Sequence, residues 1–178
     1  MSTYFIGYDL GSSSLKTALV EADSGEVVAV VKTPAAEMEI RAPLPGWAEQ
    51  DPRDWWEALV RATKMCLSDA SVRGEEIGAV SADATTCTLL PVDGEGTHLS
   101  DALMWMDVRA SEQAEKIHGT GNPALSYCPS GLAAEWMLPK ALWLKEKEPD
   151  VYRNTHAFID QLHKTYSREM VFTICFED

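Results

Sequence analysis

The segment from Ile6 to Lys16 has the residue types and the spacing needed to handle a phosphate group. It reads Ile6-Gly7-Tyr8-Asp9-Leu10-Gly11-Ser12-Ser13-Ser14-Leu15-Lys16. The glycine favours a close turn, and the small serines leave backbone N–H groups and hydroxyls free to donate to phosphate oxygens. Lys16 adds a positive charge, and Asp9 at the end of an apolar run can hold hydrated Mg²⁺, which prefers carboxylate, water and phosphate ligands.

The segment alone leaves a plain structural interpretation open. A serine-rich hairpin turn needs the same small residues and binds nothing. The choice between the two interpretations depends on what the rest of the chain supplies.

The elements around this turn predict an antiparallel meander. Apolar runs at residues 4–9 and 17–21 flank it, and the turn signal at residues 23–26 precedes a β-branched strand at 27–32. Three strands joined by two tight turns, placed before any helix, exclude a Rossmann-type start.

A helix is predicted after the loop at residues 42–50. Asp51 is a suitable N-cap and Pro52 a suitable first residue. Apolar residues then recur at helical spacing, at Trp55, Leu59, Ala62, Met65 and Cys66. We interpret Trp55 as a core residue, because aromatic side chains on such stripes mainly pack.

The rest of the chain alternates short strands and helices. Strands are predicted at residues 77–82, 88–92 and 102–105, and helices at 107–118, at 140–147 and, after Pro149, in one short further turn. Residues 119–131, with three glycines and two prolines, predict a loop.

Composition narrows the class of protein. The formal net charge of −13 disfavours nucleic-acid binding, which needs a clustered basic surface. The four cysteines are too widely spaced for a CxxC zinc site or a disulfide framework, so we expect reduced thiols. No basic n-region with an apolar h-region and no membrane-length apolar run is present, so we expect a soluble, cytoplasmic protein without a membrane partner.

The pattern Asp-x-Gly-Ser-Ser between two strands of a meander resembles the first phosphate motif of the actin, heat-shock ATPase and sugar-kinase superfamily. Four further segments resemble the FGGY carbohydrate kinases, in the order and spacing of that family. They are residues 45–52 with Trp55-Trp56, residues 83–87, residues 105–110, and Glu135-Trp136 with residues 139–145. The resemblance covers residues 4 to about 162.

This resemblance implies an α/β fold of the ribonuclease H-like, actin-like ATPase type. Its mixed sheet opens with an antiparallel three-strand meander flanked by helices, and we expect the fold to be incomplete in this chain. The implied activity is ATP-dependent phosphorylation of a sugar or polyol hydroxyl, with ATP and Mg²⁺ as cofactors. Full-length relatives of this kind can form homo-oligomers.

The implied substrate is a pentulose or pentitol, as in ribulokinase-like members of the family. Glycerol kinases carry Asn-Gln-Arg-Glu where this chain has Ala82-Asp83-Ala84-Thr85. The change removes the Arg and Glu that clasp glycerol and leaves an acceptor and a hydroxyl, which suit a longer hydroxylated chain.

The resemblance also assigns residues. It implies that the nucleotide phosphates are bound by Asp9, Gly11, Ser12, Ser13, Ser14 and Lys16, and that Asp9 holds Mg²⁺ through water. It implies that the sugar is bound by Asp83, Thr85, Trp105, Glu135 and Trp136. Core packing remains an alternative for Trp105. Arg109 is expected to orient a loop through a carboxylate. The family's catalytic base lies beyond residue 178, so no catalytic residue is assigned here.

We expect an N-terminal kinase domain at residues 1–162, truncated, and a divergent tail at 163–178. A frameshift is our hypothesis for the tail, and resequencing of the locus tests it. Two other readings stay open: a non-catalytic sugar- or phosphate-binding module that would be inactive as a kinase, and a generic α/β domain whose motifs are structural remnants.

Overall fold

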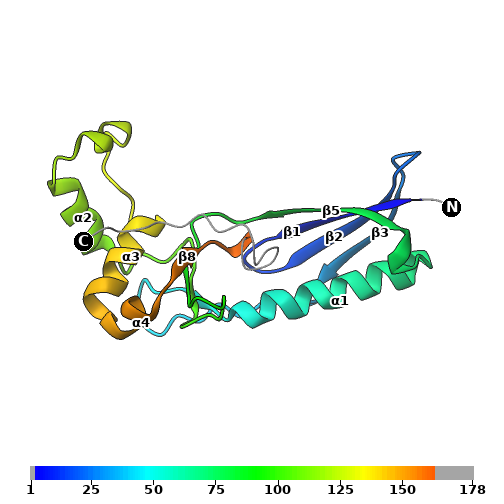
Figure 1. Ribbon diagram of the computed structural model, residues 1–178, viewed down its shortest axis with the longest axis horizontal. Helices are drawn as coiled ribbons and strands as arrows, with labels where there is room; N and C mark the ends of the chain where they lie inside the picture. The colour runs from blue at the N-terminus through cyan, green and yellow to red at the C-terminus, as the bar shows by residue number, and fades with distance from the viewer. Residues whose placement is uncertain (1–2, 163–178) are drawn as a thin grey trace. The chain divides into compact units, whose positions relative to one another are not determined.

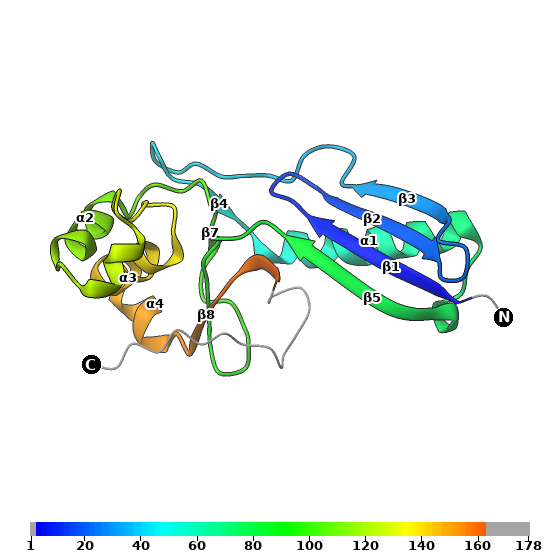
Figure 2. The same ribbon diagram turned by 90° about the horizontal axis from the view of Figure 1, so that it is seen from above.

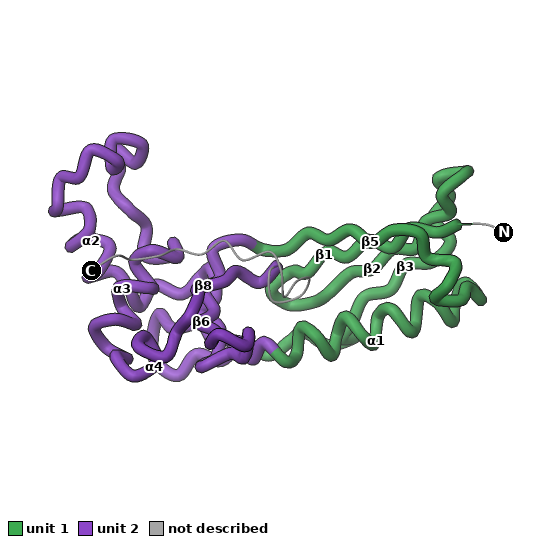
Figure 3. The backbone as a smooth tube through the Cα atoms, in the orientation of Figure 1, with its two compact units in different colours: residues 1–39, 53–85 green, residues 40–52, 86–178 purple. Residues whose placement is uncertain are grey.

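The computed structural model describes residues 3–162, which form parts of two compact units (Figure 3). Unit 1 comprises residues 1–39 and 53–85, and unit 2 comprises residues 40–52 and 86–178. The predicted tail at 163–178 lies outside the described residues. Within the described part, no helix has the length and apolar character of a membrane span.

Unit 1 is built on a four-stranded mixed sheet. Its strands are β1 (Tyr4–Leu10), β2 (Leu15–Glu21), β3 (Val27–Thr33) and β5 (Ile77–Ala84), in the order β3-β2-β1-β5. The first three strands are antiparallel neighbours and β5 runs parallel to β1. The predicted meander is therefore confirmed, and the parallel fourth strand makes the sheet mixed.

Helix α1 (Pro52–Ala70) lies along one face of this sheet (Figures 1 and 2). It begins at Pro52, as predicted, and buries Trp55, Ala62 and Cys66. The thiol of Cys66 donates to the carbonyl oxygen of Thr17 on β2 at 3.6 Å, which joins helix and sheet. Met65 was wrongly placed in the buried stripe: it is 43% exposed, because it lies about 100° around the helix from Cys66.

Unit 2 combines short strands with helices. Strand β4 (Glu49–Gln50) pairs with β7 (Ala102–Leu103), and β6 (Leu90–Val92) pairs with β8 (Ala157–Ile159), both antiparallel. The helices are α2 (Ser111–Gly119), α3 (Met137–Lys147) and α4 (Pro149–Asn154). Two 3₁₀ turns complete the list, η1 (Gly74–Glu76) in unit 1 and η2 (Pro123–Tyr127) in the predicted loop.

Two predicted helix starts were wrong. Helix α2 begins at Ser111, because Asp107 is buried and its carboxylate accepts hydrogen bonds from the backbone. Helix α3 begins at Met137, and Pro139 fits its first turn because the N–H that proline lacks has no intrahelical acceptor there. Strand β8 was not predicted, since three residues are too few to show a period.

A buried guanidinium organises the core of unit 2. Arg109 Nη2 lies 2.7 Å from Asp107 Oδ2 and 2.8 Å from Glu49 Oε1, and the Arg109 side chain is 2% exposed. The guanidinium stacks over the Trp47 ring at 3.6 Å from its centroid, and the Trp143 ring meets the Trp47 ring edge-on at 5.4 Å. The prediction that Arg109 orients a loop through a carboxylate is confirmed by these contacts.

We expect Arg109→Met to lower the free energy of unfolding by about 3–5 kcal/mol, because Asp107 would remain buried without a cation. Urea denaturation followed by far-UV circular dichroism measures the change. The matched control is Arg153→Met on α4, whose side chain is 68% exposed and whose ion pair should contribute less than about 1 kcal/mol. Equal losses in the two variants would contradict the assignment.

Candidate functional site

The turn between β1 and β2 is closed by backbone hydrogen bonds. Gly11 N donates to Ser14 O at 3.0 Å, and Met38 N donates to Ser13 O at 2.7 Å, which ties the segment after β3 to the turn. Gly11 is not among the residues with positive φ, so the turn does not need the conformational freedom of glycine. A Cβ at position 11 would lie 3.4 Å from Ser14 O, at the close limit of ordinary van der Waals contact.

The sheet of unit 1 carries a row of four charged residues. The register pairs Lys32 with Lys16, Lys16 with Asp9, and Asp9 with Asp83, which places one residue from each strand side by side. Paired residues point to the same face, and the neighbouring positions Leu15 and Leu10 are buried on the α1 side. The row therefore lies on the face opposite α1.

Two carboxylates thus neighbour each other beside two ammonium groups. Lys16 Nζ lies 3.1 Å from Asp9 Oδ2, and the two side chains are 63% and 53% exposed. An exposed pair of this kind contributes little to stability and exchanges partners readily. Lys32 was not assigned from the sequence. The predicted hairpins on both sides of the strand that carries Lys16 could have indicated that Lys32 lies beside it.

The serines of the turn differ in exposure. Ser12 and Ser13 are half-buried, whereas Ser14 is buried at 6% exposure. Ser12 and Ser13 are therefore better placed than Ser14 to meet a phosphate at the surface of unit 1.

The residues assigned to the sugar are divided between the units. Asp83 is exposed and its Oδ1 accepts from Ala84 N at 2.8 Å, while the N–H of half-buried Thr85 donates to Leu10 O at 3.1 Å, which joins the ends of β5 and β1. Both belong to unit 1.

The other three belong to unit 2. Trp105 and Trp136 are 42% and 41% exposed, and Glu135 is half-buried. The 42% exposure of Trp105 disfavours core packing, the alternative interpretation of this residue.

A buried lysine in unit 2 was not assigned a role from the sequence. Lys140 on α3 is 0% exposed, and its Nζ donates to the carbonyl oxygens of Cys87 at 3.0 Å and Met104 at 2.7 Å. Its spacing is the missed signal: with Met137 and Leu144 it occupies positions i, i+3 and i+7 of one helix face.

The environment of Lys140 changes its acidity. Burial lowers the pKa of Lys140 from 10.5 to about 8, against the opposing effect of Asp107, Cys87, Glu135 and Asp160. The neighbouring carboxylates offset only part of the cost of removing the ammonium from water.

The backbone of Cys87 is held at both its N–H and its carbonyl. Its carbonyl accepts from Lys140, and its N–H donates to Asp160 Oδ2 at 3.0 Å. Its φ is +67°, a left-handed conformation that costs a non-glycine residue about 1–2 kcal/mol. The two hydrogen bonds fix this backbone.

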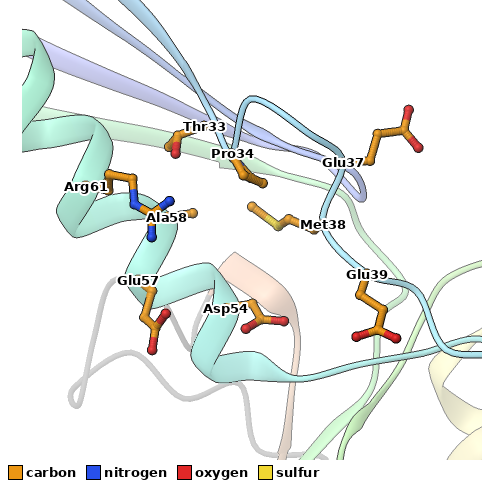
Figure 4. A pocket seen from close by; sticks show the side chains of 9 residues that line it. All are labelled: Thr33, Pro34, Glu37, Met38, Glu39, Asp54, Glu57, Ala58 and Arg61. Atoms are coloured by element: carbon orange, nitrogen blue, oxygen red, sulfur yellow. The ribbon is translucent and has the colours of Figure 1, made fainter.

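A cavity of about 210 Å³ lies in unit 1, between α1 and the segment after β3 (Figure 4). It is lined by Thr33, Pro34, Glu37, Met38, Glu39, Asp54, Glu57, Ala58 and Arg61. Four carboxylates against one guanidinium disfavour an anionic ligand such as a nucleotide phosphate. The described lining residues include none of those assigned to nucleotide or sugar.

Within residues 3–162, no three His, Cys, Asp or Glu side chains are grouped to hold a metal ion. Asp9 and Asp83 are a neighbouring pair. A pair of carboxylates fits hydrated Mg²⁺, which takes only one or two from the protein and completes its shell with water and phosphate.

Comparison with known proteins identifies the family. The pattern of the FGGY family of carbohydrate kinases, N-terminal domain, matches residues 4–170. The chain belongs to this family. FGGY relatives include a xylulose kinase of Lactococcus lactis, 34% identical over 151 residues, and one of Bacillus subtilis, 32% identical over 170 residues. These matches cover 84% and 93% of the chain but 29% and 32% of the relatives, so the chain spans about a third of their length.

Solved structures of FGGY kinases share the fold. A xylulose kinase from Rhodospirillum rubrum superposes with a TM-score of 0.80 at 20% identity, over 91% of this chain and 33% of that one. A gluconate kinase from Lactobacillus acidophilus gives 0.80 at 22% identity, over 93% and 32%. The expected actin-like ATPase fold is confirmed.

The lowered pKa of Lys140 predicts a pH dependence of stability. Between pH 8 and 10.5 the unfolded chain holds a proton on this lysine that the folded chain has released, so stability gained through Lys140 rises with pH. The difference in unfolding free energy between the parent chain and Lys140→Met should grow by about 2 kcal/mol from about pH 7.5 to about pH 9.5.

Urea titrations at several pH values measure this difference. Lys147→Met, which removes an exposed lysine of the same helix, is the matched control for the loss of one lysine. A difference for Lys140→Met that stays flat with pH would contradict the lowered pKa of Lys140.

Proposed function

We propose that this chain forms the N-terminal part of a kinase that transfers the γ-phosphoryl group of MgATP to a hydroxyl of a pentulose or pentitol. The observation that carries the proposal is the charged row of unit 1, which lies within the matched FGGY segment. Several relatives are xylulose kinases, which supports a pentulose as substrate.

The row and its turn would serve the nucleotide. Lys16 and Lys32 supply positive charge for phosphate oxygens, and the hydroxyls and N–H groups of Ser12 and Ser13 supply donors. Asp9 would hold Mg²⁺ through water, and bound Mg²⁺ would neutralise charge on the phosphates. Ser14 and Gly11 shape the turn.

The exposed groups after β5 and in unit 2 would serve the sugar. Asp83, Thr85 and Glu135 offer acceptors and a hydroxyl for sugar hydroxyls. The indoles of Trp105 and Trp136 offer apolar faces to sugar C–H groups.

The reaction needs one further group. The sugar hydroxyl oxygen bonds to the γ-phosphorus, the bond to the bridging oxygen of ADP breaks, and the hydroxyl proton passes to a base. In the family that base lies beyond the position of residue 178, so this chain supplies binding and orientation. We further propose a cytoplasmic location, no nucleic-acid or membrane partner, and homo-oligomers for the full-length form.

The test uses a fusion of residues 1–162 to the remaining two thirds of the Bacillus subtilis xylulose kinase. We expect this fusion to release ADP with a pentulose in a coupled assay, and the 178-residue chain alone to release none. Thermal shift with sugars and nucleotides on the chain alone checks binding. Sugar-induced stabilisation with no turnover in the fusion would favour the non-catalytic binding module.

In the active fusion, Asp9→Asn should lower kcat on the order of 100-fold, because the residue that orients the metal is lost. Its stability should change by less than about 1 kcal/mol, since the Asp9–Lys16 pair is exposed. Asp23→Asn, in the exposed turn after β2, is the matched control and should retain full activity. Unchanged kcat in Asp9→Asn would remove Asp9 from the site.

A further inference from the structure

Two segments of unit 2 run side by side and then lead to groups assigned to the sugar. Leu89 and Leu103 exchange backbone hydrogen bonds, each N–H to the other's carbonyl at 2.9 Å. On one side of this pair lies Cys87, two residues after Thr85. On the other side Met104 is followed at once by the exposed Trp105.

Lys140 joins the same two segments beyond the Leu89–Leu103 pair. Its ammonium has three donors, and it binds the carbonyl oxygens of Cys87 and Met104, one from each segment. A single buried side chain thereby fixes the separation of the two segments beyond Leu89 and Leu103. Both contacts lie inside unit 2.

Asp160, the residue directly after β8, also contacts Cys87. Its Oδ2 accepts from Cys87 N at 3.0 Å and its Oδ1 accepts from Gln161 N at 2.6 Å. The two peptide units that flank the Cα of Cys87 are thus both held, one by a carboxylate at the Cys87 N–H and the other by an ammonium at the Cys87 carbonyl. Cys87 needs these anchors because its φ of +67° is unfavourable for a residue with a Cβ.

We propose that Lys140 and Asp160 are positioning residues for the sugar-binding groups of unit 2, which fix the Cys87 and Met104 backbones and so the approach of Trp105 to the ligand. This inference rests on the proposed function for the ligand that the segments meet. Independently of the ligand, we expect the two segments to lose their order together when Lys140 is removed. Preorganised binding groups of this kind raise affinity because less order is gained on binding.

The first test measures amide hydrogen exchange of the 178-residue chain without sugar. In Lys140→Met we expect exchange at Cys87, Leu89, Leu103 and Met104 to accelerate at least about tenfold, while α1 and β1 stay unchanged. Lys147→Met, on the same helix but exposed, should change none of these amides. Equal acceleration throughout unit 2 would indicate a purely structural lysine and overturn the proposal, as would no change.

Asp160→Ala tests the second anchor. It should release Cys87 in the same exchange experiment, and its effect combined with Lys140→Met should be less than additive, because both side chains hold the backbone of the same residue. Independent, additive effects would contradict a shared role.

The second test uses the active fusion with D-xylulose as the probe. Lys140→Met should raise KM for xylulose at least about tenfold and leave KM for ATP within about twofold. Equal increases in both constants would overturn the sugar-site assignment. If the parent fusion phosphorylates no pentulose, the proposed function fails, and the exchange experiment still decides whether Lys140 orders the two segments.

Discussion

The guanidinium of Arg109 takes a full positive charge into the core of unit 2, where water does not solvate it. Asp107 and Glu49 balance that charge, and Asp107 also accepts the N–H of Ala48. The segment before β4 and the segment before α2 are thereby joined around one group. Because each partner depends on the others for hydrogen bonds, the loop with Trp47 has little freedom to move.

Unit 1 depends on a different constraint, the register of its strands. A one-residue shift of β2 against β1 would turn Lys16 toward α1 and bring Leu15 to the open face. Burial of Leu15 and Leu19 against the helix prevents this shift. The hydrophobic face of the sheet therefore determines which charges meet on the opposite face.

The sequence allowed the local features to be predicted. Hairpin turns, the start of α1 at Pro52 and the pairing of Arg109 with a carboxylate each depend on residues close in sequence or on strong pattern. Lys32 was placed by the β2–β3 hairpin and its signal was overlooked, whereas Lys140 depends on long-range packing. A lysine in a helix is solvated in most proteins, and only its place between Met137 and Leu144 indicated burial.

The candidate site shows the same division. The turn between β1 and β2, which we assign to phosphate by proposal, could be located because all its residues are consecutive. The exposure of Trp105 could not be predicted, because the sequence pattern of a tryptophan after an apolar run is the same whether the side chain is buried or exposed. The left-handed backbone of Cys87 also had no signal, since cysteine shows no preference for that conformation.

The parallel pairing of β5 with β1 has a consequence for the order of folding. Asp9 meets Lys16 across a hairpin, seven residues along the chain, but meets Asp83 only through a loop more than ten times longer. Closing the long loop costs more chain entropy and is slower than forming the hairpin. The cationic half of the row can thus assemble while the chain is still short, and its second carboxylate joins last.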